Sequence, residues 1–180
     1  MHRELTHNER SAVLKQTTGR DRLLLTVLLE TGCRISEALG IRIEDIVLNV
    51  PNPYLLIHTL KRRKPMDRVV PLRAGLRDTL TVEVQAAGTG RTYLFESCKR
   101  PGQPINRRQA HNIVTRAFQC AGVEQASSHS CRATFISRLH RESVPIMTIA
   151  ALAGHANIGS TQKYINITNE DLINAVNKLK

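Results

Sequence analysis

Long apolar segments are missing from this chain of 180 residues. No stretch approaches the roughly 20 apolar residues that a membrane-spanning helix needs. The N-terminal stretch MHRELTHNER also has no hydrophobic signal-peptide core. The sequence therefore argues against an integral membrane protein and against a secreted one.

Cysteine is scarce, and the four residues present are Cys33, Cys98, Cys120 and Cys131. They form no C-x-x-C pair and show no metal-ligand spacing, which excludes a disulfide scaffold and makes structural zinc unexpected. Cys33, Cys120 and Cys131 lie in helical patterns, where a thiol usually behaves as a small apolar residue. We expect a reducing cytoplasmic setting and no metal or other cofactor.

Several motifs of phosphate chemistry are also absent. There is no P-loop, no G-x-G-x-x-G and no acidic cluster suited to two Mg²⁺ ions. Any phosphoryl chemistry is therefore expected to depend on Arg, His and Lys alone. Aromatic residues make up 3% of the chain and do not interleave with its basic clusters, which argues against a stacking platform for single strands.

Basic residues, in contrast, are in clear excess. Lys and Arg total 26 against 15 Asp and Glu, for a net charge of +11. Such an excess favours a polyanionic partner, because Lys and Arg gain affinity by displacing counterions from phosphates. Nucleic acid is the expected partner; a generic basic protein, or attraction to an anionic membrane surface, is the alternative.

The hydrophobic pattern predicts one α+β domain over residues 1–180, mostly helical with a small antiparallel sheet. Thr6 and Glu9 form a capping box for the first helix, and Gly32 ends the second. The chain 99–104 is expected to be a loop. Strands are expected near 45–49, 54–60, 67–72 and 91–95; helices are expected at 6–15, 20–30, 34–39, 72–86, 106–121, 128–142, 145–153 and 168–179, with a turn near 156–160.

A run near the C-terminus, residues 127–164, carries His129, Arg132, His155 and Tyr164. His129 and Arg132 are three residues apart and so share one face of a helix. Two imidazoles, a guanidinium and a phenol suit the handling of a phosphate diester by a tyrosine nucleophile. The alternative for Tyr164 is a solvated, inert phenol, whereas Tyr54 and Tyr93 lie in strand-like runs and are expected to pack.

Arg34 adds a second guanidinium at a predicted helix start, with Glu37 three residues later. The planar forks of Arg34 and Arg132 can bind both non-bridging oxygens of a phosphate and oppose the charge of a pentavalent transition state. Glu37 then orients an arginine rather than acting as a base. A surface salt bridge is the alternative for each arginine.

Two further basic clusters are expected to contact nucleic acid, the first as a probe for a DNA groove and the second at phosphates rather than at base edges. The first, Lys61-Arg62-Arg63-Lys64, lies on a predicted hairpin turn, where one lysine could protonate a leaving oxygen. The second consists of Lys99, Arg100, Arg107, Arg108 and Arg116.

Together these residues resemble the catalytic domain of the tyrosine recombinases, the phage-integrase family of site-specific DNA recombinases. The matching motifs, in order, are Gly32-Cys-Arg-Ile-Ser-Glu37, a hairpin lysine before Arg68-Val-Val-Pro-Leu72, the pair His129–Arg132, Leu152-Ala-Gly-His155, and Tyr164 nine residues later. The resemblance covers nearly the whole chain, from about residue 5 to 175.

The resemblance implies a mechanism. Tyr164 attacks the scissile phosphate and forms a 3′-phosphotyrosine with a free 5′-hydroxyl, without metal or ATP. Arg34, His129, Arg132 and His155 bind the phosphoryl group, and the hairpin lysine is the general acid. Lys61 is preferred over Lys64, since it follows the strand directly and Pro65 lies beside Lys64.

The resemblance also implies partners and an origin. Double-stranded DNA is the substrate, and two rounds of cleavage across a tetramer exchange strands. The segment 169–180 has an amphipathic stripe that packs on its own domain or on a neighbouring subunit. A nucleoid-associated protein of bacterial, phage or mobile-element origin is expected.

The first predicted helix begins at Thr6, so the helical N-terminal core-binding domain of most family members is expected to be absent. The chain is then either a fragment or a catalytic-domain-only recombinase similar to the small invertases. A non-catalytic DNA-binding regulator on the same fold and a relaxing topoisomerase are the alternative functions.

Overall fold

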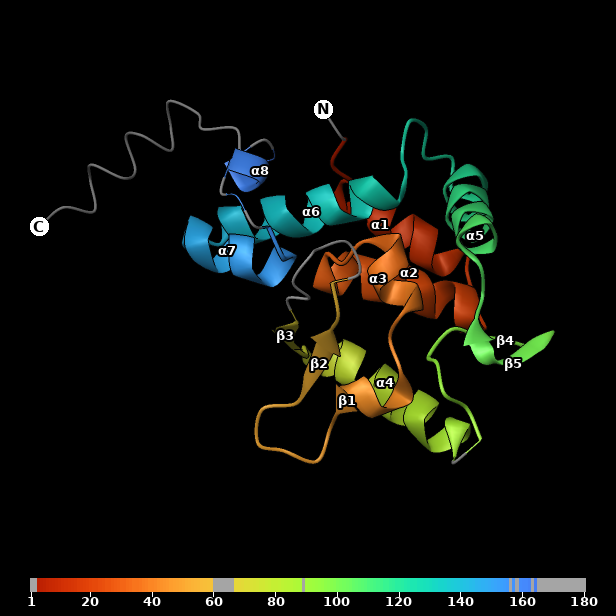
Figure 1. Cartoon of the computed structure of the whole chain (residues 1–180). Coiled ribbons are helices and arrows are strands. Elements are labelled where there is room, and N and C mark those ends of the chain that lie inside the picture. The colour runs from red at the N-terminus through yellow and green to blue at the C-terminus, as the bar shows by residue number, and fades with distance from the viewer. Residues whose placement is uncertain are drawn as a thin grey trace, which may run out of the picture.

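The computed structural model describes residues 3–59, 67–88, 90–155, 157, 159–162 and 164. Helices predominate in these ranges, beside two small antiparallel sheets (Figure 1). This confirms the predicted α+β class. The helices are α1 (His7–Lys15), α2 (Gly19–Thr31), α3 (Ile35–Leu39), α4 (Ala74–Ala87), α5 (Arg107–Cys120), α6 (Ser128–Arg141), α7 (Ile146–Ala153) and α8 (Gly159–Gln162), with a 3₁₀ turn η1 at Ile43–Asp45. The strands are β1 (Ile46–Val47), β2 (Tyr54–Ile57), β3 (Arg68–Pro71), β4 (Glu96–Ser97) and β5 (Arg100–Pro104).

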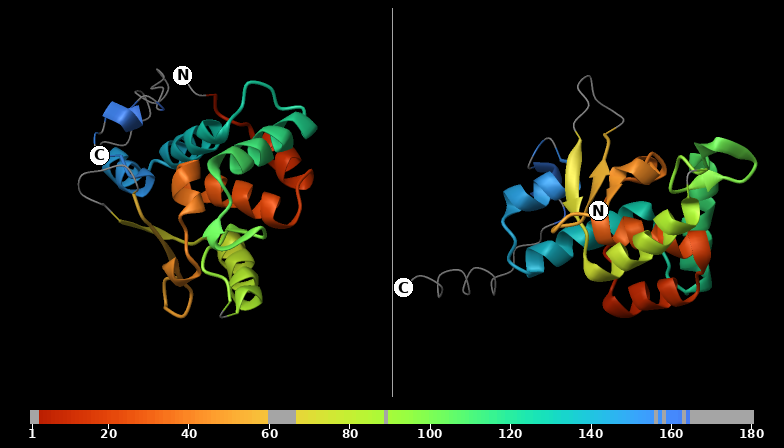
Figure 2. Two further views of the ribbon diagram at one scale, coloured as in Figure 1. Left: turned by 45° about the vertical axis from the view of Figure 1, so that its right-hand side comes forward. Right: turned by 90° about the horizontal axis from the view of Figure 1, so that it is seen from below.

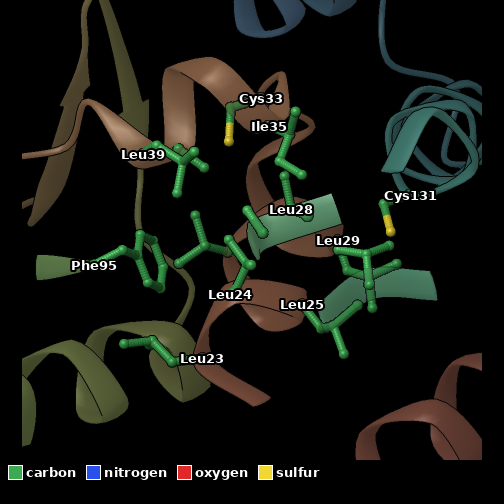
Figure 3. Packing of buried hydrophobic residues seen from close by; sticks show 14 of the residues in the cluster. Leu23, Leu24, Leu25, Leu28, Leu29, Cys33, Ile35, Leu39, Phe95 and Cys131 are labelled. Atoms are coloured by element: carbon green, nitrogen blue, oxygen red, sulfur yellow. The ribbon is translucent and has the colours of Figure 1, made fainter. Parts of the chain in front are cut away.

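Helix α2 is the centre of the core. Leu24, Leu25 and Leu28 are fully buried (Figure 3), and α2 packs against α6. Helix α2 ends at Gly32, as predicted, with a left-handed φ of 61°. A Cβ at position 32 would lie 2.3 Å from the ring of Phe135 on α6, so the two helices approach closely there. This places the end of α2, just before α3, against α6.

The larger sheet has the order β1-β2-β3 and is antiparallel throughout. Leu55 pairs with Val70, and Ile57 with Arg68, and these four side chains are buried. The sheet lies between α7 and α4 in the projection of Figure 1, and β3 contacts α7. An arginine therefore occupies an inward position beside α7.

The predicted strand at 91–95 and the predicted loop at 99–104 are both wrong. Tyr93 makes only an isolated bridge with Arg42, whereas Arg100–Pro104 forms β5 and pairs with β4. Exposed side chains occupy most of β5, so it lacks the alternation that signals a strand. Its two prolines are tolerated because a two-stranded hairpin has open edges.

Smaller differences concern single elements. Residues 159–162 form the short helix α8 rather than a turn, and Cys33 lies between α2 and α3. Cys120 is exposed, whereas burial raises the pKa of Cys33 to about 11 and that of Cys131 to about 12, so only these two behave as buried apolar groups. Tyr54 and Tyr93 are half-buried, as expected. The predicted helix 168–179 lies outside the described residues.

Candidate active site

The start of α3 positions Arg34. Its backbone N–H donates to Glu37 Oε2 at 2.9 Å, and its guanidinium donates to Glu37 Oε1 at 2.8 Å. Glu37 is 3% exposed, whereas the Arg34 side chain is 40% exposed. The carboxylate is therefore fixed in the interior and holds a guanidinium that still reaches the surface, as predicted.

Arg68, which the sequence motifs placed only in a strand, is a second partner of Glu37. Its NH2 donates to Glu37 Oε2 at 2.8 Å, and its Nε donates to the carbonyl of Leu152 at 3.0 Å. One feature of the sequence could have indicated this role. Arg68 lies two residues before Val70 in β3, and alternate residues of a strand face the same side, so both side chains point into the protein. Burial would raise the pKa of Glu37, but the hydrogen bonds and charges of Arg68 and Arg34 lower it, so the carboxylate stays ionised.

Arg132 lies deeper, at 2% exposure on α6. It donates to the carbonyls of Gly32 and Ala153, each at 2.6 Å, and so joins the ends of α2 and α7. Both carbonyls lie at the negative end of a helix dipole, which favours a cation. Burial and the neighbouring Arg34 and Arg68 lower the pKa of Arg132 to about 10, which leaves it charged at neutral pH.

The C-terminal end of α7 forms a Schellman motif around Gly154, whose φ is 67°. The N–H of His155 donates to the Ala150 carbonyl at 2.9 Å, and that of Gly154 to Ala151 at 3.0 Å. The next two carbonyls accept from Arg68 and Arg132. The last four carbonyls of α7 are thus satisfied, two of them by site arginines.

His155 follows directly and is half-buried. Its Nδ1 lies 2.7 Å from the hydroxyl oxygen of Thr161 on α8. Burial, followed by the charges of Arg132, Arg34 and Arg68, lowers the pKa of His155 to about 4. The ring of His155 is therefore neutral at pH 7.

Tyr164 is half-buried beside His155. The two rings are stacked, with centroids 6.0 Å apart and planes 10° apart. The Tyr164 N–H donates to Thr161 O at 3.0 Å, and the Tyr164 carbonyl accepts from Ser137 Oγ at 3.2 Å. Because Tyr164 also packs on a buried cluster that includes Ile136 and Ile149, it is not a freely solvated phenol.

The structure brings Arg34, Arg132, His155 and Tyr164 together with Glu37 and Arg68. His129 lies in the first turn of α6 and is exposed, unlike Arg132 on the next turn. Lys61, Arg62, Arg63 and Lys64 lie outside the described residues.

The second basic cluster occupies another part of the surface. Lys99 and Arg100 are exposed at the β4–β5 hairpin, and Arg107 and Arg108 are exposed in the first turn of α5. Arg116, near the end of α5, pairs with Asp21 at 2.8 Å. In Figure 1 and in the right-hand view of Figure 2, α5 and the β4–β5 hairpin lie at the opposite end of the molecule from α7.

Neither a metal-binding cluster nor a membrane-spanning helix is present in the described ranges. No group of three or more His, Cys, Asp or Glu side chains in that part of the chain could hold a metal ion. Within the same ranges, no helix is long and apolar enough to cross a membrane.

A family match agrees with this fold and with this arrangement of site residues. Residues 3–171 match the Phage integrase family, and the chain therefore belongs to that family. Among curated relatives, the chain is 32% identical to tyrosine recombinase XerA of Thermococcus kodakarensis over 170 residues, which cover 94% of this chain and 58% of that relative. The chain thus spans less than two thirds of the relative's length.

Solved structures show the same fold. The crystal structure of XerA recombinase superimposes with a TM-score of 0.80 at 22% identity, covering 97% of this chain and 64% of that one. The XerH site-specific recombinase, bound to palindromic difH substrate in a post-cleavage complex, gives a TM-score of 0.77 at 22% identity, covering 98% and 53%. The predicted family and fold are confirmed.

Proposed function

We propose that this chain is the catalytic part of a site-specific DNA recombinase in which Tyr164 is the nucleophile. The phenol oxygen forms a bond to phosphorus and releases its proton to water, while the bond from phosphorus to the 5′ oxygen breaks. The departing 5′ oxygen takes up a proton, for which Lys61 is the proposed donor and Lys64 the alternative. Attack by a 5′-hydroxyl from another duplex reverses these steps and exchanges strands.

The observation that carries this proposal is the charge of the cluster beside Tyr164. Among the described residues, Arg34 and Arg68 pair with the carboxylate of Glu37, Arg132 donates to the carbonyls of Gly32 and Ala153, and His155 is neutral at pH 7. The cluster therefore carries two net positive charges. A phosphodiester carries one negative charge and its pentavalent transition state carries two, so the site favours the transition state over the bound substrate.

Arg34, Arg132, His129 and His155 are the residues proposed to contact the phosphoryl oxygens. In the tautomer in which Nδ1 of His155 accepts a hydrogen bond from the Thr161 hydroxyl, Nε2 carries the ring proton and can donate a hydrogen bond to a phosphate oxygen. Because the His155 ring is neutral, it can donate this hydrogen bond without being repelled by the three arginines.

Double-stranded DNA is the proposed substrate; the related XerH site-specific recombinase is bound to palindromic difH substrate in its crystal structure. Arg107 and Arg108 support this, because cations in the first turn of a helix oppose the helix dipole and gain from an anionic partner. We further propose that four copies assemble across two DNA sites as a tetramer and that residues 169–180 contribute to this assembly.

A duplex with a nick close to the cleavage position tests the chemistry, because the short 5′ fragment diffuses away and traps the covalent complex. The wild-type chain is expected to accumulate a protein–DNA adduct, and Tyr164→Phe to bind the duplex without forming one. Equal binding by both proteins with no adduct would instead support a DNA-binding regulator. Relaxation of any supercoiled plasmid by the wild type alone would support a topoisomerase.

A further inference from the structure

We propose that Arg68 is a positioning residue of this site, which holds Arg34 through Glu37 and His155 through the C-terminal end of α7. The inference rests on the proposed function, because it concerns the placement of groups around the same phosphate.

The contacts of Arg68 lead to two different site residues. Its NH2 donates to Glu37 Oε2, the same oxygen that accepts from the backbone N–H of Arg34. Its Nε donates to Leu152 O, three residues before His155. One rigid guanidinium therefore links β3, the start of α3 and the end of α7, three elements that are distant in sequence (Figure 2).

Arg68 does not itself reach the substrate side of the cluster. Its side chain is 7% exposed, against 40% for Arg34. Its third nitrogen, NH1, is buried and has no hydrogen-bond partner in the described part of the chain. A buried N–H group without a hydrogen-bond partner destabilises the fold. An apolar residue at position 68 would fill the same space without this cost, so packing alone does not explain an arginine there.

Gly154 supplies an independent observation. A Cβ at position 154 would lie 2.7 Å from Arg68 NH1 and 3.0 Å from Cζ, so the guanidinium rests directly against the backbone of the turn that leads into His155. Only a residue without a side chain allows this approach. The position of His155 and the position of Arg68 are therefore set together.

The charge of Arg68 is part of the same arrangement. Arg34 and Glu37 alone would form a neutral pair at the surface. By sharing Glu37, Arg68 leaves the exposed guanidinium of Arg34 only partly neutralised, and Arg34 therefore remains able to bind a phosphate.

The test is a double-mutant cycle on the rate of adduct formation with the nicked duplex. Arg68→Met should slow the reaction by about 10- to 100-fold, because small displacements of groups around a reacting atom have effects of this size. Arg68→Lys should be slowed similarly, since an ammonium group cannot hold Glu37 and Leu152 O in the geometry of a guanidinium. In an Arg34→Ala background, Arg68→Met should add less than about threefold, because residues that act through one another are not additive.

The matched control is Arg91→Met. Arg91 also combines an ion pair, to Glu83 at 2.9 Å, with a buried and unpartnered nitrogen, and its pair lies on α4. This variant should react at the wild-type rate. Duplex binding and the thermal unfolding midpoint are measured for every variant, and if Arg68→Met does not fold, the cycle with Arg68→Lys decides.

The outcomes separate this inference from the proposed function. Independent, multiplicative effects of the Arg68 and Arg34 substitutions, or a wild-type rate for Arg68→Lys, would overturn the role of Arg68 while the wild-type adduct persists. Absence of a wild-type adduct would overturn both.

Discussion

Glu37 is a buried carboxylate with two guanidinium partners, Arg34 and Arg68. Replacing Glu37 with Gln would leave both guanidinium groups beside a neutral amide, without a negative charge to balance them. We expect Glu37→Gln to lower the free energy of unfolding by about 3 kcal/mol, the usual cost of breaking a buried ion pair. Chemical denaturation measures this.

Glu83→Gln is the matched control for Glu37→Gln. Its partner Arg91 is 30% exposed and Glu83 is 28% exposed, so the pair is accessible to solvent. The change should be about 1 kcal/mol or less. Equal losses for the two variants would contradict the role assigned to Glu37.

His155 and His58 should titrate in opposite directions from the ordinary imidazole pKa. The pKa of His155 is lowered to about 4 by burial and by three arginines, whereas hydrogen bonds to Asp45 and Asp67 raise the pKa of His58. An NMR titration of the two rings measures this directly. A midpoint for His155 at or above that of His58 would refute the account of its surroundings.

The same shifts set the effect of acid on stability. Below the ordinary pKa of 6.5 the unfolded chain protonates His155, whereas the folded chain does so only near pH 4. His155 therefore destabilises the fold progressively as the pH falls from 6.5 to about 4. His58 acts in the opposite sense: its stabilisation is complete at low pH and is lost as the pH rises through its raised pKa.

At the scale of elements, the end of α7 combines backbone conformation with side-chain contact. Gly154 and Gly122 have nearly the same φ, 67° and 66°, but a Cβ at 122 would meet nothing within 4 Å. Gly122→Ala should therefore cost only the backbone strain, about 1 kcal/mol.

Gly154→Ala should cost about 1–3 kcal/mol more than Gly122→Ala, because the added methyl must also displace Arg68. The difference between the two variants in chemical denaturation is the quantity to compare. Equal costs would mean that the contact between Arg68 and the turn is unimportant.

The sequence predicts elements well where a local signal exists. The capping box at Thr6 and Glu9 and the stop at Gly32 are as expected, because hydrogen bonds within four residues set these helix ends. Strand β5 was missed, because its pairing with β4 has no apolar alternation to reveal it. In the site, Arg34, Arg132 and Tyr164 could be predicted because they lie in recognisable sequence motifs. The roles of Arg68 and Thr161 depend on contacts formed by the folded chain, which no local sequence pattern contains.

At the scale of the whole molecule, the basic surface extends well beyond the site. The β4–β5 hairpin and α5 carry five exposed cations, of which Arg116 pairs with Asp21, and lie at the far end from α7 in Figure 1 and in the right-hand view of Figure 2. A duplex bound at Tyr164 and at this surface would have to cross most of one face of the domain. Phosphate contacts there would contribute affinity without sequence preference.

Replacing Arg107 and Arg108 with Gln should weaken duplex binding about equally for all sequences. The slope of log K against log salt should fall by about 0.9 for each phosphate contact that is lost. Arg77→Gln is the control, because Arg77 is exposed but paired with Asp78 at 2.8 Å. An unchanged slope for the double variant would exclude this surface from DNA binding.

The central claim is that Tyr164 becomes covalently joined to DNA, and the most direct measurement is mass spectrometry of the protease-digested adduct trapped on the nicked duplex. We predict a nucleotide attached through its 3′ phosphate to the phenol oxygen of Tyr164, and loss of this product in Tyr164→Phe. Attachment at Tyr54, Tyr93 or any other residue, or the absence of a covalent product from a chain that binds the duplex, would contradict the account.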